Sequence, residues 1–187
     1  AAYAVTYERN LARVPEGVPL ELMGPLGCGI QTGAGAIMRS MACEAGSSLV
    51  IAGGGAVGLS AVMGARLMDV AEIVVIEPQA SRRALAIELG ATSAIDPMAG
   101  SVAQALKKIA PAGFDYALDT TGRSDSLANL LGCLAPRGLL GLIGISAPGT
   151  QLPADINTVM AAGHRIMGII EGDSDPAAFI PELIAHY

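Results

Sequence analysis

The segment Gly53–Gly58 places three glycines in the spacing G-x-G-x-x-G. The run Leu49–Ala52 before it has β-strand character, and Ala56–Met68 has the composition of a helix. A second β-type run ends at Glu77, about 20 residues after the last of these glycines, as in a dinucleotide-binding βαβ unit. The glycine spacing alone is a weak signal. The strand, turn and helix around it make it a strong one.

Each glycine of this turn has an expected physical task. Gly53 permits the tight turn, Gly55 lets the backbone approach a pyrophosphate, and Gly58 lets the helix pack close to the strand. The helix that opens at Ala56 and Val57 offers free N–H groups and a partial positive charge to phosphates. The turn therefore predicts a site for the pyrophosphate of a dinucleotide.

Glu77 is the expected ligand of the adenosine ribose. A carboxylate there accepts hydrogen bonds from ribose hydroxyls and repels a 2′-phosphate, so NAD is favoured over NADP. Arg82 and Arg83 follow, and arginine beside this site can serve a 2′-phosphate. Two alternatives stay open. One is a glycine-rich turn with a surface glutamate and no ligand. The other is an S-adenosylmethionine methyltransferase, whose glycines usually run closer together.

Short apolar runs and helical segments alternate along the chain, which predicts βαβ units and a doubly wound parallel sheet of Rossmann type. The runs are continuous rather than alternating, as expected for strands covered on both faces. Strands are predicted at Leu49–Ala52, Ile73–Ile76, Thr92–Ile95, Phe114–Leu118, Gly138–Ile143 and Arg165–Ile170. Helices are predicted at Ala56–Met68, Ser81–Leu89, Ser101–Ile109, Ser124–Leu134 and Pro176–Ala185, the last with Asp175 as N-cap.

Residues 1–20 differ from the rest because Pro15, Gly17 and Pro19 interrupt them. We expect them to be a leading segment outside the α/β unit, which then covers residues 21–187. The chain ends within a predicted helix, which suggests a fragment of a longer protein.

The net charge and the cysteine content indicate which classes of partner and which cellular compartment to expect. The net charge is −6 over 187 residues and no basic cluster offsets it, which argues against a nucleic-acid partner. No apolar stretch approaches the roughly 18–20 residues of a membrane span, so no membrane partner is expected. Cys28, Cys43 and Cys133 are an odd number of widely spaced cysteines, typical of reduced thiols in a cytoplasmic protein. We expect Cys43 and Cys133 to lie in the core.

Four further stretches, together with the glycine turn, carry a family resemblance. They are Gly27–Gly35, Asp119–Gly122, Leu142–Ile145 and Gly168–Asp173. In this order they resemble the zinc-dependent alcohol dehydrogenases of the medium-chain superfamily. The forms Gly-Cys-Gly-Ile-Gln-Thr-Gly and Ile-Glu-Gly-Asp look most like its aryl-alcohol (benzyl alcohol) dehydrogenases. The resemblance covers nearly the whole chain.

The resemblance implies a role for each matching residue. Cys28 matches a thiolate ligand of the catalytic zinc. Thr32 and Val57 match positions that hold the nicotinamide. Glu77 matches the acidic residue that binds the adenosine ribose, and Arg82 matches the basic residue beside it. Further cofactor contacts are implied for Thr121, Ile143 and Ile145, with Glu171 in a late loop near the cofactor.

The departures from the family pattern matter equally. A catalytic zinc needs three protein ligands, and the family's other ligands, its proton relay and its structural-zinc cysteines have no counterpart here. The chain therefore resembles a cofactor-binding domain without its catalytic domain, and we expect it to be inactive alone.

The implied activity of the parent enzyme is oxidation of a primary, aromatic alcohol to its aldehyde by hydride transfer to NAD, with zinc as second cofactor. Alternatives are a zinc dehydrogenase for an aliphatic or sugar alcohol, a zinc-free quinone reductase, which leaves Cys28 without a role, and a non-catalytic dinucleotide sensor. A homo-oligomer is expected through a sheet edge, at Arg165–Ile170 or Leu139–Ile143.

Overall fold

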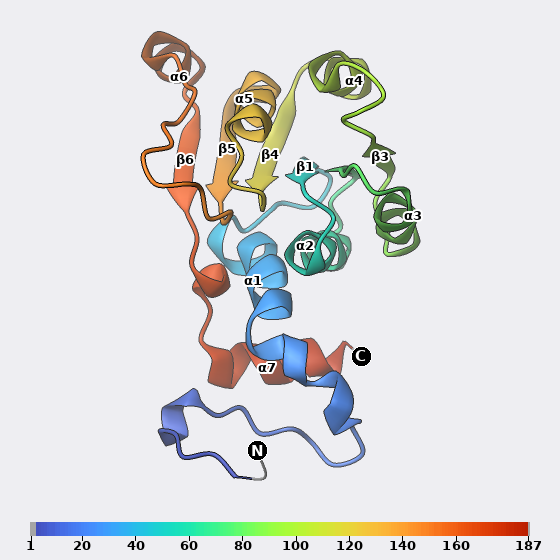
Figure 1. Ribbon diagram of the computed structural model, residues 1–187, viewed down its shortest axis with the longest axis vertical. Coiled ribbons are helices and arrows are strands. Elements are labelled where there is room, and N and C mark those ends of the chain that lie inside the picture. Colours follow the sequence, from blue (N-terminus) through green and yellow to red (C-terminus); the bar gives the residue numbers. More distant parts are fainter. Residues whose placement is uncertain (1–2, 187) are drawn as a thin grey trace.

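A computed structural model describes residues 3–186 (Figure 1). Residues 1, 2 and 187, which belong to the predicted ranges 1–20 and 21–187, lie outside this described part. The strands are β1 (Ser48–Ala52), β2 (Glu72–Ile76), β3 (Ser93–Ile95), β4 (Phe114–Asp119), β5 (Leu134–Leu142) and β6 (Arg165–Gly168). The helices are α1 (Gly29–Gly35), α2 (Ala56–Leu67), α3 (Ala80–Glu88), α4 (Val102–Ile109), α5 (Ser124–Gly132), α6 (Ile156–Ala162) and α7 (Pro176–Ala185).

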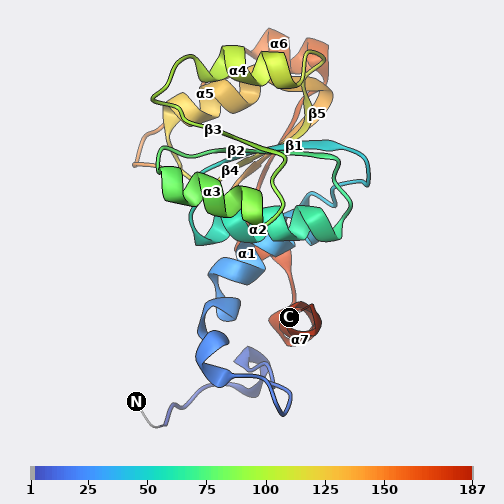
Figure 2. The same ribbon diagram turned by 90° about the vertical axis from the view of Figure 1, so that its right-hand side faces the viewer.

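The six strands form one parallel sheet in the order β3-β2-β1-β4-β5-β6. Helices α1, α2 and α3 cover one face, and α4, α5 and α6 cover the other (Figure 2). The chain therefore has the doubly wound Rossmann-type fold that the sequence predicts. Of the two runs predicted to pair between subunits, Leu139–Ile143 lies mostly in β5, which has a neighbouring strand on both sides. The other run begins with β6, which has an open edge.

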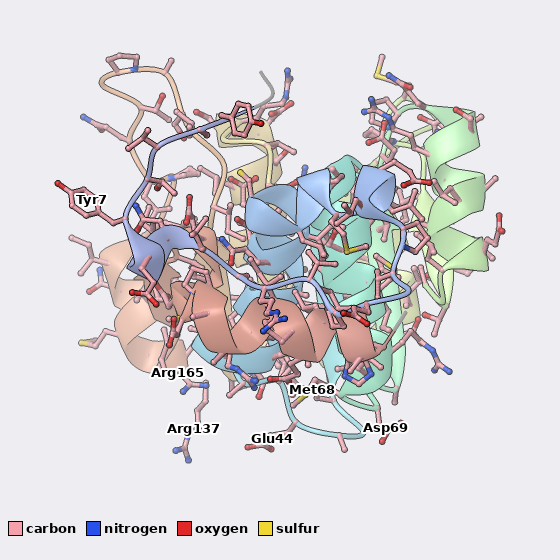
Figure 3. The ribbon with its side chains drawn as sticks, turned by 90° about the horizontal axis from the view of Figure 1, so that it is seen from below. Tyr7, Glu44, Met68, Asp69, Arg137 and Arg165 are labelled. Carbon is pink, nitrogen blue, oxygen red and sulfur yellow. The ribbon has the colours of Figure 1, made fainter. Side chains whose placement is uncertain are left out.

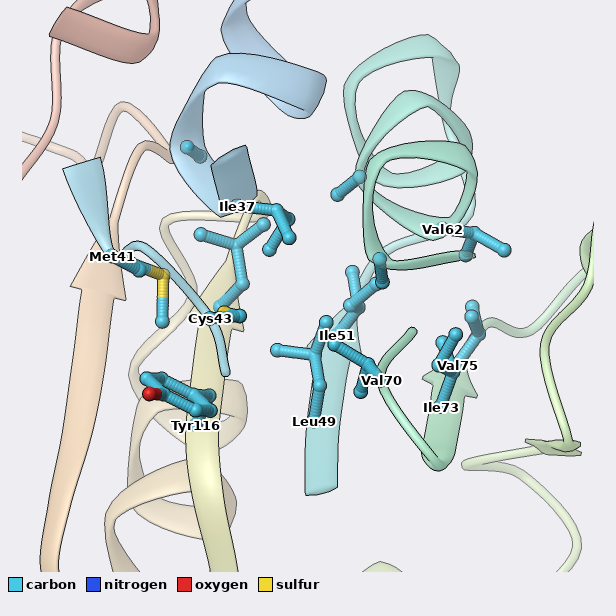
Figure 4. Close-up of a cluster of buried hydrophobic side chains, with 14 of the residues drawn as sticks. Ile37, Met41, Cys43, Leu49, Ile51, Val62, Val70, Ile73, Val75 and Tyr116 are labelled. Atoms are coloured by element: carbon cyan, nitrogen blue, oxygen red, sulfur yellow. The ribbon is translucent and has the colours of Figure 1, made fainter. Parts of the chain in front are cut away.

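Burial on both faces explains the continuous apolar runs. Val50 of β1 lies between Val74 and Ala117 of its neighbouring strands. One layer of the core fills the space under α1 and α2 and includes Ile37, Cys43 and Leu49 (Figure 4). The other layer lies under α4 and α5 around Leu106, Phe114 and Leu130. Cys43 is fully buried and Cys133 partly buried, each packed in one of these layers as predicted.

Two predicted boundaries near β5 are wrong. The helix ends at Gly132 rather than Leu134, and the strand begins at Leu134 rather than Gly138. Leu134 pairs with Phe114 and Leu139 with Tyr116, so extra residues bulge between the two pairs. Arg137, in this bulge, has a φ of +66°. Because the bulge interrupts the strand, the apolar pattern of the sequence does not predict its first half.

Two helices, α1 and α6, have no counterpart among the predicted elements. Helix α1 continues into a π-helical turn at Ala36–Ser40. Its glycines lower helix propensity by about 1 kcal/mol each, but they allow close packing. A Cβ on Gly33 would overlap the carbonyl oxygen of Val57 on α2. Tertiary packing thus determines a helix that local sequence disfavours.

The two ends of the described chain lie at the same end of the molecule, beyond α1 (Figures 1 and 2). Helix α7 begins as predicted, with the Asp175 carboxylate accepting from the N–H of Ala177 at 3.1 Å. Leu26, Ile180 and Ile184 form a small cluster that joins α7 to the segment before α1. Arg39 of the π-helical turn also pairs with Glu182. The boundary at residue 20 stays a prediction.

Between residues 3 and 186, no helix has both the length and the apolar character needed to cross a membrane.

Candidate functional site

The candidate site lies at the carboxyl ends of the strands. The strand order reverses between β1 and β4, and in open α/β sheets ligands bind at that switch point. The glycine turn follows β1, Glu77 follows β2, Thr121 follows β4, and Ile143 follows β5. The fold therefore gathers these predicted residues along one edge of the sheet.

A groove of about 550 Å³ opens at this edge. The residues that line it include Gly53, Gly55, Glu77, Arg82 and Thr121. A second polar groove of about 500 Å³ lies at the opposite, amino ends of the strands. Glu44, Arg137 and Arg165 line the second groove (Figure 3), so its charges are of both signs. The glycine turn contributes only to the first groove.

The backbone of the turn fits the tasks expected of its glycines. Gly53 has a φ of +99°, and a Cβ there would overlap Thr120 Oγ1. A Cβ on Gly58 would overlap the carbonyl oxygen of Gly53, so helix and strand are as close as backbone allows. At Gly55 a Cβ would meet nothing within 4 Å. The space beside Gly55 is open to a ligand.

Helix α2 points its N-terminus at this open space. Its N-cap is Gly55, and no side chain caps the first turn. The unpaired N–H groups and the helix dipole are there the natural partners of a phosphate group. Ala56 is exposed and Val57 half-buried in this first turn.

Glu77 is a buried carboxylate, with 4% of the residue exposed. Its Oε2 accepts from the N–H of Gly54 at 2.8 Å, and its Oε1 accepts from the N–H of Gln79 at 2.8 Å. A carboxylate has about four acceptor positions, so each oxygen keeps one for a further donor. Gly54 was overlooked in the sequence pattern, which treats it as a spacer. A Cβ on Gly54 would lie 2.9 Å from Glu77 Cγ.

The two arginines after Glu77 have different surroundings. Arg82 is half exposed, and its Nη1 lies 4.0 Å from Glu77 Oε2. Arg83 is held by the carbonyl oxygens of Glu77 and Pro78 and by an ion pair of 3.0 Å with Asp96. Arg82 is therefore the cation available at the groove, and Arg83 holds the loop after β2.

At the turn after β4 lies a second buried carboxylate, that of Asp119, the last residue of the strand. The sequence pattern did not indicate it as a functional candidate. Asp119 is 1% exposed. Its Oδ1 accepts from the N–H and the hydroxyl of Thr121, and its Oδ2 accepts from the N–H of Gly122. Ile143 follows β5 next to this turn, and Ile145, two residues on, is almost fully exposed. The signal in the sequence was an acidic residue at the end of an apolar strand.

Helix α1 carries two more predicted residues. Thr32 is buried, at 7% exposure, and Cys28 is exposed just before the helix begins. Gly29, next to Cys28, lies against Ala56 at the start of α2, where a Cβ would be 3.6 Å from the Ala56 Cβ. Helix α1 therefore begins near the N-terminus of α2 that faces the groove.

The late loop Glu171–Asp173 packs on α1 as well. All three residues have positive φ, and a Cβ on Gly172 would lie 2.7 Å from Gly35 Cα. Gln31 Nε2 lies 3.4 Å from Glu171 Oε2. The loop is therefore fixed to the helix that carries Thr32.

Cys28 is the predicted zinc ligand of this chain. Within the described residues no group of three or more His, Cys, Asp or Glu could hold a metal ion. One thiolate does not meet the three-ligand requirement of a catalytic zinc. The residues described here therefore do not by themselves form a zinc site.

Comparisons with known proteins identify the family. Residues 56–185 match the family of zinc-binding dehydrogenases. The chain is 46% identical over 183 residues to geraniol dehydrogenase of Castellaniella defragrans, covering 97% of this chain and 49% of that protein. The chain spans about half the length of the relatives it matches.

Two solved structures share the fold. An alcohol dehydrogenase zinc-binding domain protein from Burkholderia ambifaria superposes with a TM-score of 0.92 at 47% identity, over 95% of this chain and 48% of that one. Benzyl alcohol dehydrogenase from Acinetobacter calcoaceticus superposes with a TM-score of 0.91 at 39% identity, over 94% of this chain and 49% of that one. With the glycine turn, the buried Glu77 and the strand order, these matches show that the chain belongs to the zinc-binding dehydrogenase family.

Proposed function

We propose that this chain binds NAD(H) and serves as the cofactor domain of an enzyme that oxidises a primary alcohol to its aldehyde. The observation that carries the proposal is the buried Glu77 carboxylate beside the open glycine turn. Each Glu77 oxygen has a free acceptor position for a ribose hydroxyl. The carboxylate also repels a 2′-phosphate, which favours NAD over NADP.

The residues of this chain bind and orient the cofactor. The N-terminus of α2 and the space beside Gly55 receive the pyrophosphate. Thr32, Val57 and the backbone of Ile143 and Ile145 orient the nicotinamide, in line with the family resemblance. The nicotinamide supplies the hydride-accepting chemistry, while the protein supplies position and electrostatics.

We propose an aromatic, benzyl-type alcohol as the substrate of the whole enzyme. Similarity to a benzyl alcohol dehydrogenase supports this choice. The similarity to a geraniol dehydrogenase favours geraniol as a second candidate substrate. Geraniol and benzyl alcohol are both primary alcohols whose carbinol carbon adjoins an unsaturated carbon. The coarser proposal is a primary alcohol of that kind, with zinc supplied by ligands that include Cys28 and otherwise come from outside this chain.

The test of cofactor binding is a parallel titration of the chain with NADH and NADPH, repeated with Glu77→Gln. Tighter binding of NADH than of NADPH, with the preference lost in Glu77→Gln, supports the proposal. Equal or tighter NADPH binding by the unmodified chain contradicts NAD dependence. Binding of S-adenosylmethionine in place of either nucleotide contradicts the dinucleotide site altogether.

Substrate and catalysis need the whole protein. Turnover of benzyl alcohol and geraniol with NAD, compared by kcat/KM, decides between the two candidates. NADH binding without turnover of any alcohol by the zinc-loaded whole protein favours the non-catalytic sensor.

We also propose a homo-oligomer that forms through the open edge of β6. Arg165 and Gly168 at its ends are exposed, and Ile170 just after it is 78% exposed. An open strand edge offers unpaired backbone groups to a second copy. Sedimentation showing only monomers at high concentration would contradict this assembly.

A further inference from the structure

We infer that Asp119 is a positioning residue for the nicotinamide half of the cofactor. The inference rests on the proposed function, because it assigns a role within the same site. Asp119 ends β4 and is almost fully buried. Among the side chains that the structure describes, none forms an ion pair with its carboxylate. A buried charge of this kind is costly unless hydrogen bonds satisfy it.

The carboxylate is satisfied by the loop that follows it. Oδ1 accepts from the Thr121 N–H at 3.1 Å and from the Thr121 hydroxyl at 2.7 Å. Oδ2 accepts from the Gly122 N–H at 2.9 Å. Both oxygens therefore hold the loop by accepting hydrogen bonds. A carboxylate has two such acceptor oxygens, whereas an amide has only one.

The main chain of Asp119 holds the next loop. Its carbonyl oxygen accepts from the N–H of Ile143 and from the N–H of Gly144, both at 3.0 Å. Side chain and main chain of one residue thus join the loop after β4 to the loop after β5.

The two loops pack with no spare room. A Cβ on Gly144 would lie 2.8 Å from Asp119 Oδ2 and 2.7 Å from the Thr121 nitrogen. A Cβ on Gly122, where φ is +67°, would lie 2.5 Å from the Ile145 carbonyl oxygen. A displacement of the Asp119 carboxylate is therefore passed directly to the backbone of residues 143–145. In the proposed function, that backbone orients the nicotinamide.

The adenosine half is held elsewhere. Glu77 belongs to the loop after β2 and takes its backbone donors from Gly54 and Gln79. No hydrogen bond joins Glu77 to Asp119 in the described part of the chain. A change at Asp119 is therefore expected to affect the two halves of the cofactor unequally.

The test is Asp119→Asn, which keeps the shape but turns an amide N–H toward either Thr121 or Gly122. NADH is titrated by fluorescence and AMP, as a probe of the adenosine half, by NMR chemical shifts. Both titrations are run well below the unfolding temperature of each variant. We expect NADH binding to weaken roughly tenfold and AMP binding to change by less than twofold.

Asp69→Asn is the matched control, since it makes the same charge change in an exposed turn where φ is +54° and Asn is tolerated. It should change neither affinity. If Asp119→Asn does not fold, Asp119→Ser, which leaves one acceptor oxygen in place of two, should weaken NADH binding about fivefold, again with AMP binding unchanged.

Three results would overturn the inference. Unchanged NADH binding by folded Asp119→Asn means that the residue only stabilises the fold. Equal losses for NADH and AMP mean that it does not act on the nicotinamide half. If the unmodified chain binds neither NADH nor AMP, the proposed function fails and this role fails with it.

Discussion

The backbone N–H of Gly54 donates to Oε2 of Glu77 at 2.8 Å, which joins the turn after β1 to the end of β2. The residue proposed to bind the ribose therefore also holds in place the turn proposed to bind the phosphates. Loss of the carboxylate would remove both the proposed contact to the ligand and a support of the turn. For this reason Glu77→Gln, which keeps the volume, is a cleaner probe than a truncation.

Gly55→Ala should separate binding from folding. A Cβ there meets no protein atom within 4 Å, so the unfolding temperature should change by no more than a few degrees. The same Cβ fills the space proposed for the pyrophosphate, so NADH binding should weaken at least tenfold by calorimetric titration. Unchanged NADH affinity would show that the ligand does not lie against this glycine.

Gly58→Ala should act in the opposite sense, on folding. Its Cβ would overlap the Gly53 carbonyl oxygen, so α2 must move away from β1. Overpacking of this kind costs about 1–3 kcal/mol, which urea unfolding measures. Gly132→Ala is the control, because Gly132 is exposed near the end of α5 and a Cβ there meets nothing within 4 Å. Equal stabilities of the two variants would contradict the close contact.

Arg82 and Arg83 should give different phenotypes. Arg82→Ala should weaken NADPH binding more than NADH binding and leave stability unchanged, because Arg82 is half exposed near Glu77. Arg83→Ala should lower the free energy of unfolding by about 2 kcal/mol, since it removes charge-assisted hydrogen bonds to Glu77 and Pro78 and the ion pair with Asp96. Urea unfolding and paired nucleotide titrations check both statements.

The three thiols should react at different rates. Cys28 is exposed, while burial raises the pKa of Cys43 and of Cys133 to about 12. Because the thiolate is the reactive form, a disulfide reagent at pH 8 should modify one thiol per chain quickly and two only after unfolding. Cys28→Ser should remove the fast reaction. A second fast thiol would show that one buried site opens readily.

The same burial predicts how stability depends on pH. Unfolded Cys43 and Cys133 ionise near their ordinary pKa of 9.0, while in the folded chain they stay protonated up to about 12. The folded state then binds more protons, so the free energy of unfolding should fall as pH rises from about 9 to about 12. Unfolding curves at several pH values test the slope, and Cys43→Ala should make it shallower.

Much of the fold could be predicted because local signals agreed with tertiary structure. The glycine turn and the β-branched run ending at Ile76 fixed β1, α2 and β2, and they placed Glu77 at the carboxyl edge. Helix α1 could not be predicted, because its glycines are favourable only once α2 is packed against them. Asp119 and Gly54 were missed for a related reason, since their partners come from neighbouring loops whose meeting depends on the whole sheet.

The close crossing of α1 and α2 at Gly33 has a consequence for how the site can vary. Helix α1 carries Thr32 and begins beside Cys28, and α2 presents the N-terminus proposed for the phosphates. Because the backbones of the two helices touch where they cross, the distance between their N-terminal ends is fixed. Substitutions elsewhere in the site leave this distance unchanged. If the proposed function holds, a change of substrate leaves unaltered the distance between the proposed phosphate-binding end of α2 and the start of α1.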